Sequence, residues 1–591
     1  MELLVLLLRL LLAAAAFLGV CSLVNRRACL PAAYVPLLTC CLVGCALMLM
    51  GILNVLRMAA PLFLLAGAYG LITEFRRGAR PRWWRSPATL ALLVLAAYFF
   101  VYFYGRVITE DDDFNHWAII VRVMLRYHRL PRFTDTVILF PSYPPGTAGL
   151  LYLGCRLLGT DDGGTMLFFQ TGVMLCAMLP LLARVRTKGV LRAVSYAIIL
   201  LFFALGLTMN PGTAIQSLYV DALLALLCLG GVVIAYDLRA DMAARLFVLL
   251  PIAGFLAITK GSGLYFSAVL AAQAGWYVWR AGNRRRAVRC FAGLLGGPAG
   301  LLILWNRHAD LVFEGGLMTR HSTSPRYMLH KALSKGGASL LATLGGFLHT
   351  LGTFSEMLPS IATLSLVSAL ALLGALTRSR SPFRPRSLIG ASVAVYVTYL
   401  LGLLGMYLFN MPEDSIEAFS RYLGTALLLI TGIATLYLLE LINALPALPV
   451  RTRVAGLCAA GALLAAFCWV LKPPFLTLAR YPSEREATVR ELASYMPEHD
   501  KETRYLVYIW DGHREQNYGH RMTHYVAYPA QSDIVSTDDD GLLLLDRWTE
   551  EYDYFIAFWT DDAYRAYAVA HGLDPDVKLW TRDAFLSAYT G

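Results

Sequence analysis

The chain has 591 residues, of which 58% are hydrophobic and 15% are charged, with a formal net charge of +11. This apolar excess excludes an ordinary water-soluble globular protein and indicates a chain that crosses a membrane many times. The 11 cysteines show neither the spacing of a zinc site nor a disulfide framework, so these two classes of protein are excluded as well.

Apolar runs of roughly 18–22 residues recur along the chain and predict about 14 transmembrane helices. The first run, Leu3–Val24, has no cationic leader and no clear cleavage site, so we expect it to remain as a helix. Segment 338–357 is either a further span or a helix lying in the interface. The predicted spans centre on 4–24, 31–53, 56–73, 87–107, 164–183, 191–209, 217–237, 245–259, 262–279, 288–305, 359–377, 387–409, 420–442 and 453–471.

The connections between these spans differ in charge, which predicts their sides. Arginines gather at alternate helix ends, for example at Arg26–Arg27 and Arg280–Arg289, and these ends are expected to face the cytoplasm. The opposite side then holds four segments, namely the loop 108–163, the turn at Lys260, the loop 306–336 and the C-terminal region. The sequence therefore predicts a multi-pass protein of a bacterial plasma membrane with these segments extracytoplasmic.

Three consecutive aspartates, Asp111, Asp112 and Asp113, follow the fourth predicted span. From Phe114 onward apolar residues recur at helical spacing, which predicts an amphipathic helix lying on the membrane surface. Asp is a preferred N-cap, so helix capping is one interpretation. One Asp would suffice for a cap, and carboxylates kept at a membrane edge are usually functional. We therefore favour catalysis or ligand binding for the triplet.

Further candidate residues lie in the other predicted outer segments. Tyr143 stands in a Tyr-Pro-Pro-Gly turn, which either closes a loop or shapes a substrate groove. Lys260, in a Gly-rich turn, either snorkels to lipid headgroups or binds a phosphate. Arg421 and Tyr422 begin a late helix, where a structural ion pair is the alternative to ligand binding. The basic loop 306–336 adds Arg320 and His321 as candidates for substrate binding.

The region after residue 478 changes character. From Arg480 onward it holds 11 Lys+Arg and 21 Asp+Glu, a net charge of −10. Residues 504–510 and 553–559 resemble short buried strands, while Ser483 with Glu486 forms a capping-box pattern before a helix that ends near Met496. A small extramembrane α/β domain is therefore predicted at 479–591.

These motifs together resemble the GT-C superfamily of integral-membrane glycosyltransferases, which includes protein O-mannosyltransferases and the bacterial lipid A aminoarabinose transferase. The residues that carry the resemblance are Asp112-Asp113-Phe114-Asn115-His116-Trp117, Tyr143-Pro144-Pro145-Gly146, Thr259-Lys260-Gly261 and Arg421-Tyr422. It implies a GT-C-like transmembrane catalytic core at 87–478, preceded by extra transmembrane helices at 1–86. The chain departs from the family pattern in those three extra helices and in having an acidic triplet.

The resemblance implies a sugar transfer from a polyprenyl-phosphate carrier to a glycan, lipid or protein acceptor, with inversion and with no nucleic acid involved. An aspartate acts as general base, and we rank Asp112 first, then Asp113, then Asp111. Lys260 and Arg421 would stabilise the departing phosphate, with His116 among the substrate-binding residues. No cofactor is required by this reading, although Asp111–Asp113 could bind Mg²⁺ or Mn²⁺.

Two other functions remain open from the sequence. A transporter or flippase would also have about 14 helices, but such proteins keep their charged sites near mid-membrane. A polymerase or ligase of lipid-linked polysaccharide would also carry large outer loops. Because the acidic cluster lies in the first large outer loop, the sequence favours the transferase. The sugar, the acceptor and the oligomeric state are not encoded in any pattern that we identify.

Overall fold

The computed structural model describes residues 2–76, 86–208, 215–313, 325–377, 381–411, 416–471, 483–536, 544–545 and 548–589. Arg320 and His321 lie outside these residues. The chain forms two compact units, and the first comprises residues 1–104, 121–135 and 140–479. The second unit comprises 105–120, 136–139 and 480–591. The three-part division expected from the sequence stays a prediction.

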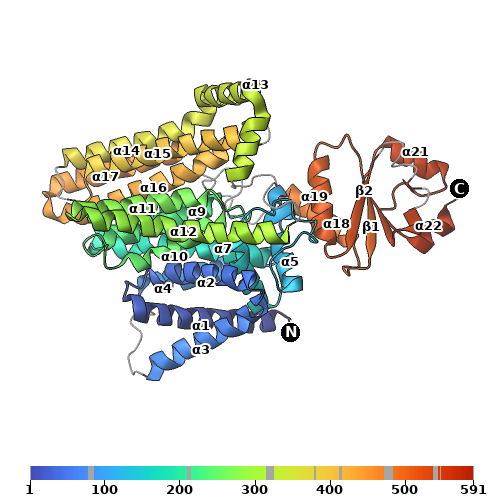
Figure 1. The fold of residues 1–591 in the computed structure, drawn as a ribbon, viewed down its shortest axis with the longest axis horizontal. Coiled ribbons are helices and arrows are strands. Elements are labelled where there is room, and N and C mark those ends of the chain that lie inside the picture. The colour runs from blue at the N-terminus through green and yellow to red at the C-terminus, as the bar shows by residue number, and fades with distance from the viewer. Residues whose placement is uncertain are drawn as a thin grey trace. The chain divides into compact units, whose positions relative to one another are not determined.

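The first unit is built of helices (Figure 1). Up to residue 471 the α-helices are α1 (Glu2–Ala28), α2 (Val35–Ile52), α3 (Ala59–Arg76), α4 (Pro87–Phe103), α5 (Ile119–Tyr127), α6 (Gly146–Leu158), α7 (Gly163–Met178), α8 (Gly189–Thr208), α9 (Asp221–Asp237), α10 (Leu250–Thr259), α11 (Gly263–Arg280), α12 (Arg284–Val312), α13 (Pro325–Gly352), α14 (Phe354–Leu376), α15 (Pro385–Phe409), α16 (Phe419–Ala444) and α17 (Val450–Leu471). Short helical turns are η1 (Leu56–Met58), η3 (Asp113–Trp117), η4 (Leu179–Arg184), η5 (Leu246–Val248) and η6 (Leu445–Ala447).

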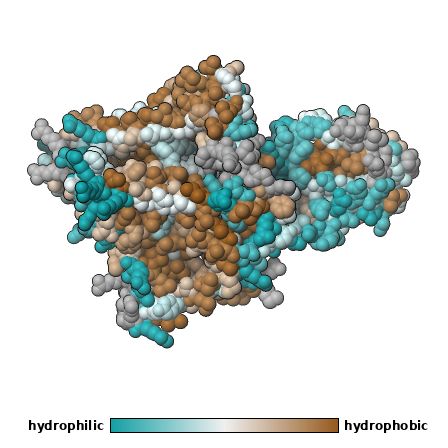
Figure 2. All heavy atoms as spheres, in the orientation of Figure 1, coloured by the Kyte–Doolittle hydropathy of each residue, from teal (hydrophilic) through white to brown (hydrophobic). Residues whose placement is uncertain are grey.

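Ten helices among the described residues are long and apolar enough to cross a membrane. They coincide with ten of the predicted spans, and the other four predicted spans are also helical, as α4, α9, η5 with α10, and α11. Large apolar side chains are exposed on many of them, as on Leu65 and Leu401, and Figure 2 shows apolar side chains covering much of this unit. The chain is an integral, multi-pass membrane protein, and the predicted all-α membrane fold is confirmed.

The segment 338–357, expected as a span or as a helix in the interface, belongs mostly to α13, in which Gly336 adopts a positive φ of 67° and breaks the regular helix. Another predicted feature differs in the structure. Phe114, Val121 and Met124, expected on a helix lying flat in the lipid surface, are buried in the protein. No helix is predicted at 146–158, where α6 forms, because a segment of 13 residues is too short for an ordinary span.

α9 and α16 form the centre of the helical unit. Nearly every residue of α9 is buried, and 94% of the most apolar window of α16 is buried. A helix that is apolar on all sides belongs in the interior, surrounded by other helices. α9 packs against α7, α10, α11 and α16, while α16 also packs against α14 and α15. The polar ends of α9 and α16 therefore lie deep among other helices.

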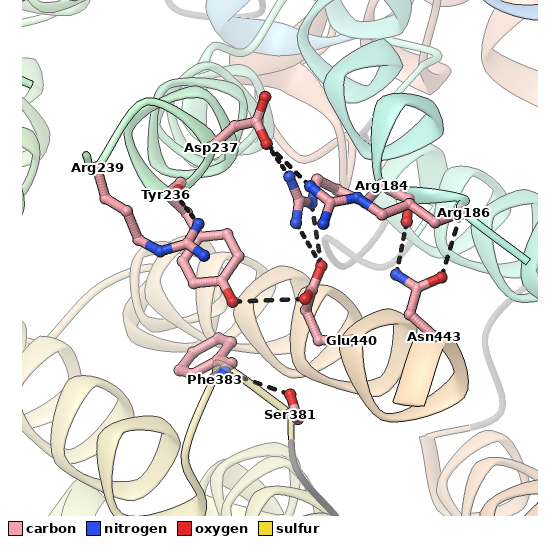
Figure 3. Close-up of polar contacts among 9 residues, drawn as sticks. All are labelled: Arg184, Arg186, Tyr236, Asp237, Arg239, Ser381, Phe383, Glu440 and Asn443. Carbon is pink, nitrogen blue, oxygen red and sulfur yellow. Dashed lines mark hydrogen bonds and ion pairs between the residues drawn. The ribbon is translucent and has the colours of Figure 1, made fainter. Parts of the chain in front are cut away.

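A network of buried charges joins η4, α9 and α16 at one of these ends (Figure 3). Arg184 is fully buried, and its guanidinium donates to Glu440 at 3.1 and 2.6 Å and pairs with Asp237. The Tyr236 hydroxyl donates to the second oxygen of Glu440 at 3.5 Å. The Asn443 side chain donates to the Arg184 carbonyl at 2.8 Å. Because removing one partner strands a buried charge, this network is expected to lock the three elements together.

The second unit contains a four-stranded sheet in the order β2-β1-β3-β4. β1 pairs in parallel with β2 and β3, whereas β4 is antiparallel to β3. Figure 1 shows α18 and α19 on one side of this sheet and α21 and α22 on the other. The elements are α18 (Glu484–Ser494), β1 (Arg504–Ile509), α19 (Gln516–Ala527), β2 (Gln531–Val535), η8 (Trp548–Glu550), β3 (Tyr554–Trp559), α21 (Asp562–Ala570), β4 (Leu579–Thr581) and α22 (Arg582–Ala588).

The predicted α/β domain is confirmed by these elements. Both predicted strands are present, and their side chains are buried on both faces, as is usual for parallel strands covered by helices. Ser483 caps α18 by accepting a hydrogen bond from the Glu486 amide at 3.0 Å. Trp548 and Phe555 belong to the core on the side of α21 and α22.

We predict that Glu440→Ala lowers the thermal unfolding midpoint of the detergent-solubilised protein strongly, because it leaves Arg184 short of a counter-charge. Breaking a buried ion pair typically costs about 3–5 kcal/mol. Asp241→Ala, at an exposed carboxylate in the turn that follows α9, is the matched control and should leave the midpoint nearly unchanged. Equal midpoints for the two variants would contradict a locking role for the network.

Candidate functional site

The helical unit brings three charged side chains together at the ends of helices that are distant in sequence. The Lys260 ammonium lies 3.0 Å from one oxygen of Asp221, and Arg421 Nε lies 3.7 Å from the other. Asp221 is in the first turn of α9, where the helix dipole favours an anion. Lys260 follows α10, and Arg421 is in the first turn of α16. One carboxylate thus holds two cations.

The turn at Lys260 has a tight backbone. Lys260 itself is extended, with φ −159° and ψ 153°, and α11 begins three residues later at Gly263. A Cβ at Gly263 would lie 1.8 Å from the Leu256 carbonyl oxygen, so this position requires glycine. The close return of the chain fixes Lys260 between α10 and α11 and directs its ammonium toward Asp221.

Tyrosines surround the two cations. Lys260 Nζ lies 5.1 Å from the centre of the Tyr422 ring and 5.9 Å from that of Tyr143. The Arg421 guanidinium lies 4.8 Å from the Tyr219 ring centre and donates to the Tyr422 hydroxyl at 3.1 Å. Such contacts stabilise desolvated cations. Tyr143, Lys260, Arg421 and Tyr422, each a candidate from the sequence, therefore lie in one site.

The three charged side chains of this site lie in a poorly hydrated place. The side chains are 6% exposed at Asp221, 12% at Lys260 and 21% at Arg421. Burial alone would lower the pKa of Lys260, but the Asp221 carboxylate more than offsets it and holds that pKa above its ordinary value. Lys260 is therefore charged at neutral pH, and an arginine guanidinium is always charged in this range. A lysine and an arginine side by side suit an anionic ligand.

A cavity of about 310 Å³, which we call the Lys260 cavity, adjoins Lys260 and Asp221. Its lining combines Asp221, Lys260 and Tyr422 with apolar side chains that include Leu403 and Met406. A cavity with a charged part and an apolar part is suited to a ligand that has an anionic group and a hydrocarbon portion.

The predicted acidic triplet belongs to the second unit. Asp112 precedes the π-helical turn η3, and its side chain makes no capping hydrogen bond to that turn, so simple capping by Asp112 is not observed. Asp113 is fully buried, and His116 is 1% exposed with its ring 4.7 Å from that of Trp117. π-helical turns are rare and occur often at functional sites.

Asp111 has a partner from a remote part of the sequence. It pairs with Arg521 of α19. Burial raises the pKa of Asp111, the Arg521 guanidinium opposes this shift, and the neighbouring Asp112 adds to it. The three adjacent carboxylates therefore have different surroundings. Within the described parts of the chain, no group of three His, Cys, Asp or Glu side chains is arranged to hold a metal ion. Cation binding by Asp111–Asp113 stays a prediction.

The sequence analysis missed Asp221. It lies inside the predicted span 217–237, where a single carboxylate hardly changes the average hydropathy. An ionisable residue within a membrane span is itself a functional signal, and it would have identified Asp221. Asp221, one partner of Arg421, is about 200 residues away from it in the sequence, so their pairing could not be seen from local spacing.

Comparison with known proteins gives structural matches only. No protein-family model and no curated protein matches the chain. ArnT from Cupriavidus metallidurans, solved bound to undecaprenyl phosphate, has a similar fold with 16% identity and a TM-score of 0.39, covering 84% of this chain and 96% of that chain. The Archaeoglobus fulgidus oligosaccharyltransferase, tethered to an acceptor peptide, has 13% identity and a TM-score of 0.40, covering 76% of this chain and 64% of that chain.

With TM-scores below 0.5, neither match assigns a residue or a reaction to this chain.

We predict that Asp221→Asn lowers the thermal midpoint in detergent, because Lys260 and Arg421 then lose the carboxylate that they share. Inorganic phosphate should raise the midpoint of this variant more than that of Asp241→Asn, since an anion can replace the lost carboxylate. An identical response of the two variants to phosphate would mean that the paired cations do not accept an anion.

Proposed function

We propose that the chain is a membrane glycosyltransferase that moves a hexosyl or pentosyl sugar from a polyprenyl-phosphate carrier to an acceptor hydroxyl on the extracytoplasmic face. The observation that carries this proposal is the pair of cations, Lys260 and Arg421, held by one carboxylate, Asp221, together with the cavity that Lys260 and Asp221 line. A polyprenyl phosphate has the matching chemistry, an anionic phosphate joined to a long apolar chain. The motif resemblance to GT-C enzymes supports the same donor.

The proposed reaction is a single displacement at the anomeric carbon. The acceptor oxygen forms the new glycosidic bond as the bond between the anomeric carbon and the phosphate oxygen breaks, which inverts the configuration. An aspartate of the 111–113 triplet, Asp112 by preference, takes the proton of the acceptor hydroxyl. The departing phosphate oxygen keeps the bonding electron pair, and the Lys260 and Arg421 cations stabilise its added negative charge.

The position of the charges favours this function over transport. Asp221 and Arg421 lie in the first turns of their helices, and Lys260 lies in the turn between two helices. A transporter more often carries its charged site near mid-membrane on interrupted helices. Charges at helix ends suit a lipid whose phosphate lies at headgroup level and whose chain extends along the apolar part of the cavity.

Lys260→Ala should reduce the transfer rate from a polyprenyl-phosphate sugar roughly 100-fold, because one stabilising cation is lost from the developing phosphate charge. The assay measures the labelled sugar that purified protein transfers in detergent or liposomes. Lys188→Ala, at an exposed lysine of the same unit, is the control and should transfer normally. An unaltered rate in Lys260→Ala would make Lys260 a residue that only anchors the helix end.

Asp112→Asn should abolish transfer, with a loss of roughly 10²–10⁴-fold, because the amide cannot take up the acceptor proton. The thermal midpoint should stay close to that of the wild type, since the substitution keeps the shape of the side chain. Binding of the polyprenyl-phosphate donor, measured separately, should also persist. Normal transfer by Asp112→Asn would remove this residue from the role of base and pass it to Asp113.

A further inference from the structure

Within the second unit, α18 and α19 make several contacts to residues 109–113, which include the acidic triplet and which we call the acidic segment. On α19, Arg521 pairs with Asp111, and the Tyr518 hydroxyl donates to the Thr109 carbonyl at 3.0 Å. On α18, Arg485 lies 3.8 Å from Glu110. These contacts reach successive residues on the N-terminal side of η3, so the backbone that leads to the acidic triplet is fixed by the C-terminal helices.

An apolar contact on the other side of the triplet completes this arrangement. Phe114 is 2% exposed, and its ring centre lies 5.4 Å from that of Tyr518 and 5.2 Å from that of Tyr525. Tyr518, Arg521 and Tyr525 recur at spacings of three and four residues, so they share one face of α19. This face contacts the chain both before and after Asp112, and it contacts Asp111 through a charge.

The charged groups around Asp111 are negative where they come from its own segment and positive where they come from α18 and α19. Its own segment contributes two further carboxylates, Glu110 and Asp112, and the helices contribute the guanidinium groups of Arg485 and Arg521. Adjacent carboxylates repel one another, and an arginine that neutralises one of them lowers the cost of keeping its neighbour ionised. Arg521 neutralises Asp111, the immediate neighbour of the proposed base.

We infer that Arg521 is a positioning residue, which pairs with Asp111 and so holds the neighbouring Asp112 in place as the carboxylate that receives the acceptor proton. The inference rests on the proposed function and assigns the C-terminal domain a task in it. Asp111 then has a structural role, and the triplet contains one base rather than three equivalent candidates.

The test compares Arg521→Ala, Arg521→Lys, Asp111→Asn and the double variant Arg521→Ala/Asp111→Asn in sugar transfer. Arg521→Ala should lower kcat roughly 10–100-fold, because the base is misplaced. Its KM for the polyprenyl-phosphate donor should not change, since Lys260 and Arg421 are untouched. Arg521→Lys, which keeps the positive charge, should recover most of the activity. The double variant should be no slower than Arg521→Ala, because both substitutions remove the same contact.

Arg514→Ala is the matched control, since this arginine lies just before α19. Its side chain is 76% exposed, and that of its ion-pair partner Glu484 is 86% exposed. It should transfer like the wild type. Normal kcat in Arg521→Ala overturns the inference, and so does a loss in Asp111→Asn as complete as that in Asp112→Asn. A loss in Arg521→Ala that Arg521→Lys does not recover also overturns it.

A second measurement separates this inference from the proposed function. Limited proteolysis at residues 105–120 should speed up in Arg521→Ala and in Asp111→Asn, and no further in the double variant, whatever reaction the protein catalyses. If proteolysis follows this pattern but the wild-type protein transfers no sugar, the proposed function is overturned and the Arg521–Asp111 contact is still supported. Proteolysis rates unchanged by Arg521→Ala would overturn the positioning role itself.

Discussion

The shared carboxylate of Asp221 is the interaction on which the candidate site depends. A lysine and an arginine from different helices could not remain charged side by side in a poorly hydrated place without it, because each charge would be desolvated and would repel the other. Asp221 binds one with each oxygen. This shared contact brings the ends of α9, α10 and α16 together and holds the Lys260 ammonium at the wall of the Lys260 cavity.

The Arg184 network follows the same rule, that a buried charge needs an opposite charge beside it, but its role differs. There the guanidinium groups of Arg184 and Arg186 face two carboxylates, Glu440 and Asp237. At the Lys260 site two cations share the Asp221 carboxylate, and Lys260 and Asp221 line a cavity. The Arg184 network ties elements of the fold together, whereas a cation that borders open volume can accept an anion. The adjoining space, rather than burial alone, distinguishes the Lys260 site.

The sequence predicted the helices well because lipid requires long apolar runs, which are visible without any knowledge of contacts. Lys260 and Arg421 were recognisable as cations on a side that otherwise avoids them. Asp221 was hidden, because the average hydropathy of its span masks one carboxylate. The pairing of Asp111 with Arg521 could not be predicted, because 410 residues separate them and many arginines were available. Patterns of spacing reveal local structure, but long-range partners are set by the tertiary fold.

The acidic triplet shows how tertiary contacts divide a motif that looks uniform in sequence. Asp111 is paired with Arg521, Asp113 is fully buried, and Asp112 stands at the start of a π-helical turn. The C-terminal region has a net charge of −10, yet the groups that it pairs with Glu110 and Asp111 are the arginines Arg485 and Arg521. A domain of that charge would repel the segment if its acidic groups faced it. The local choice of arginine on α18 and α19 therefore outweighs the overall charge, since Coulomb energies at contact distance exceed those screened over a Debye length.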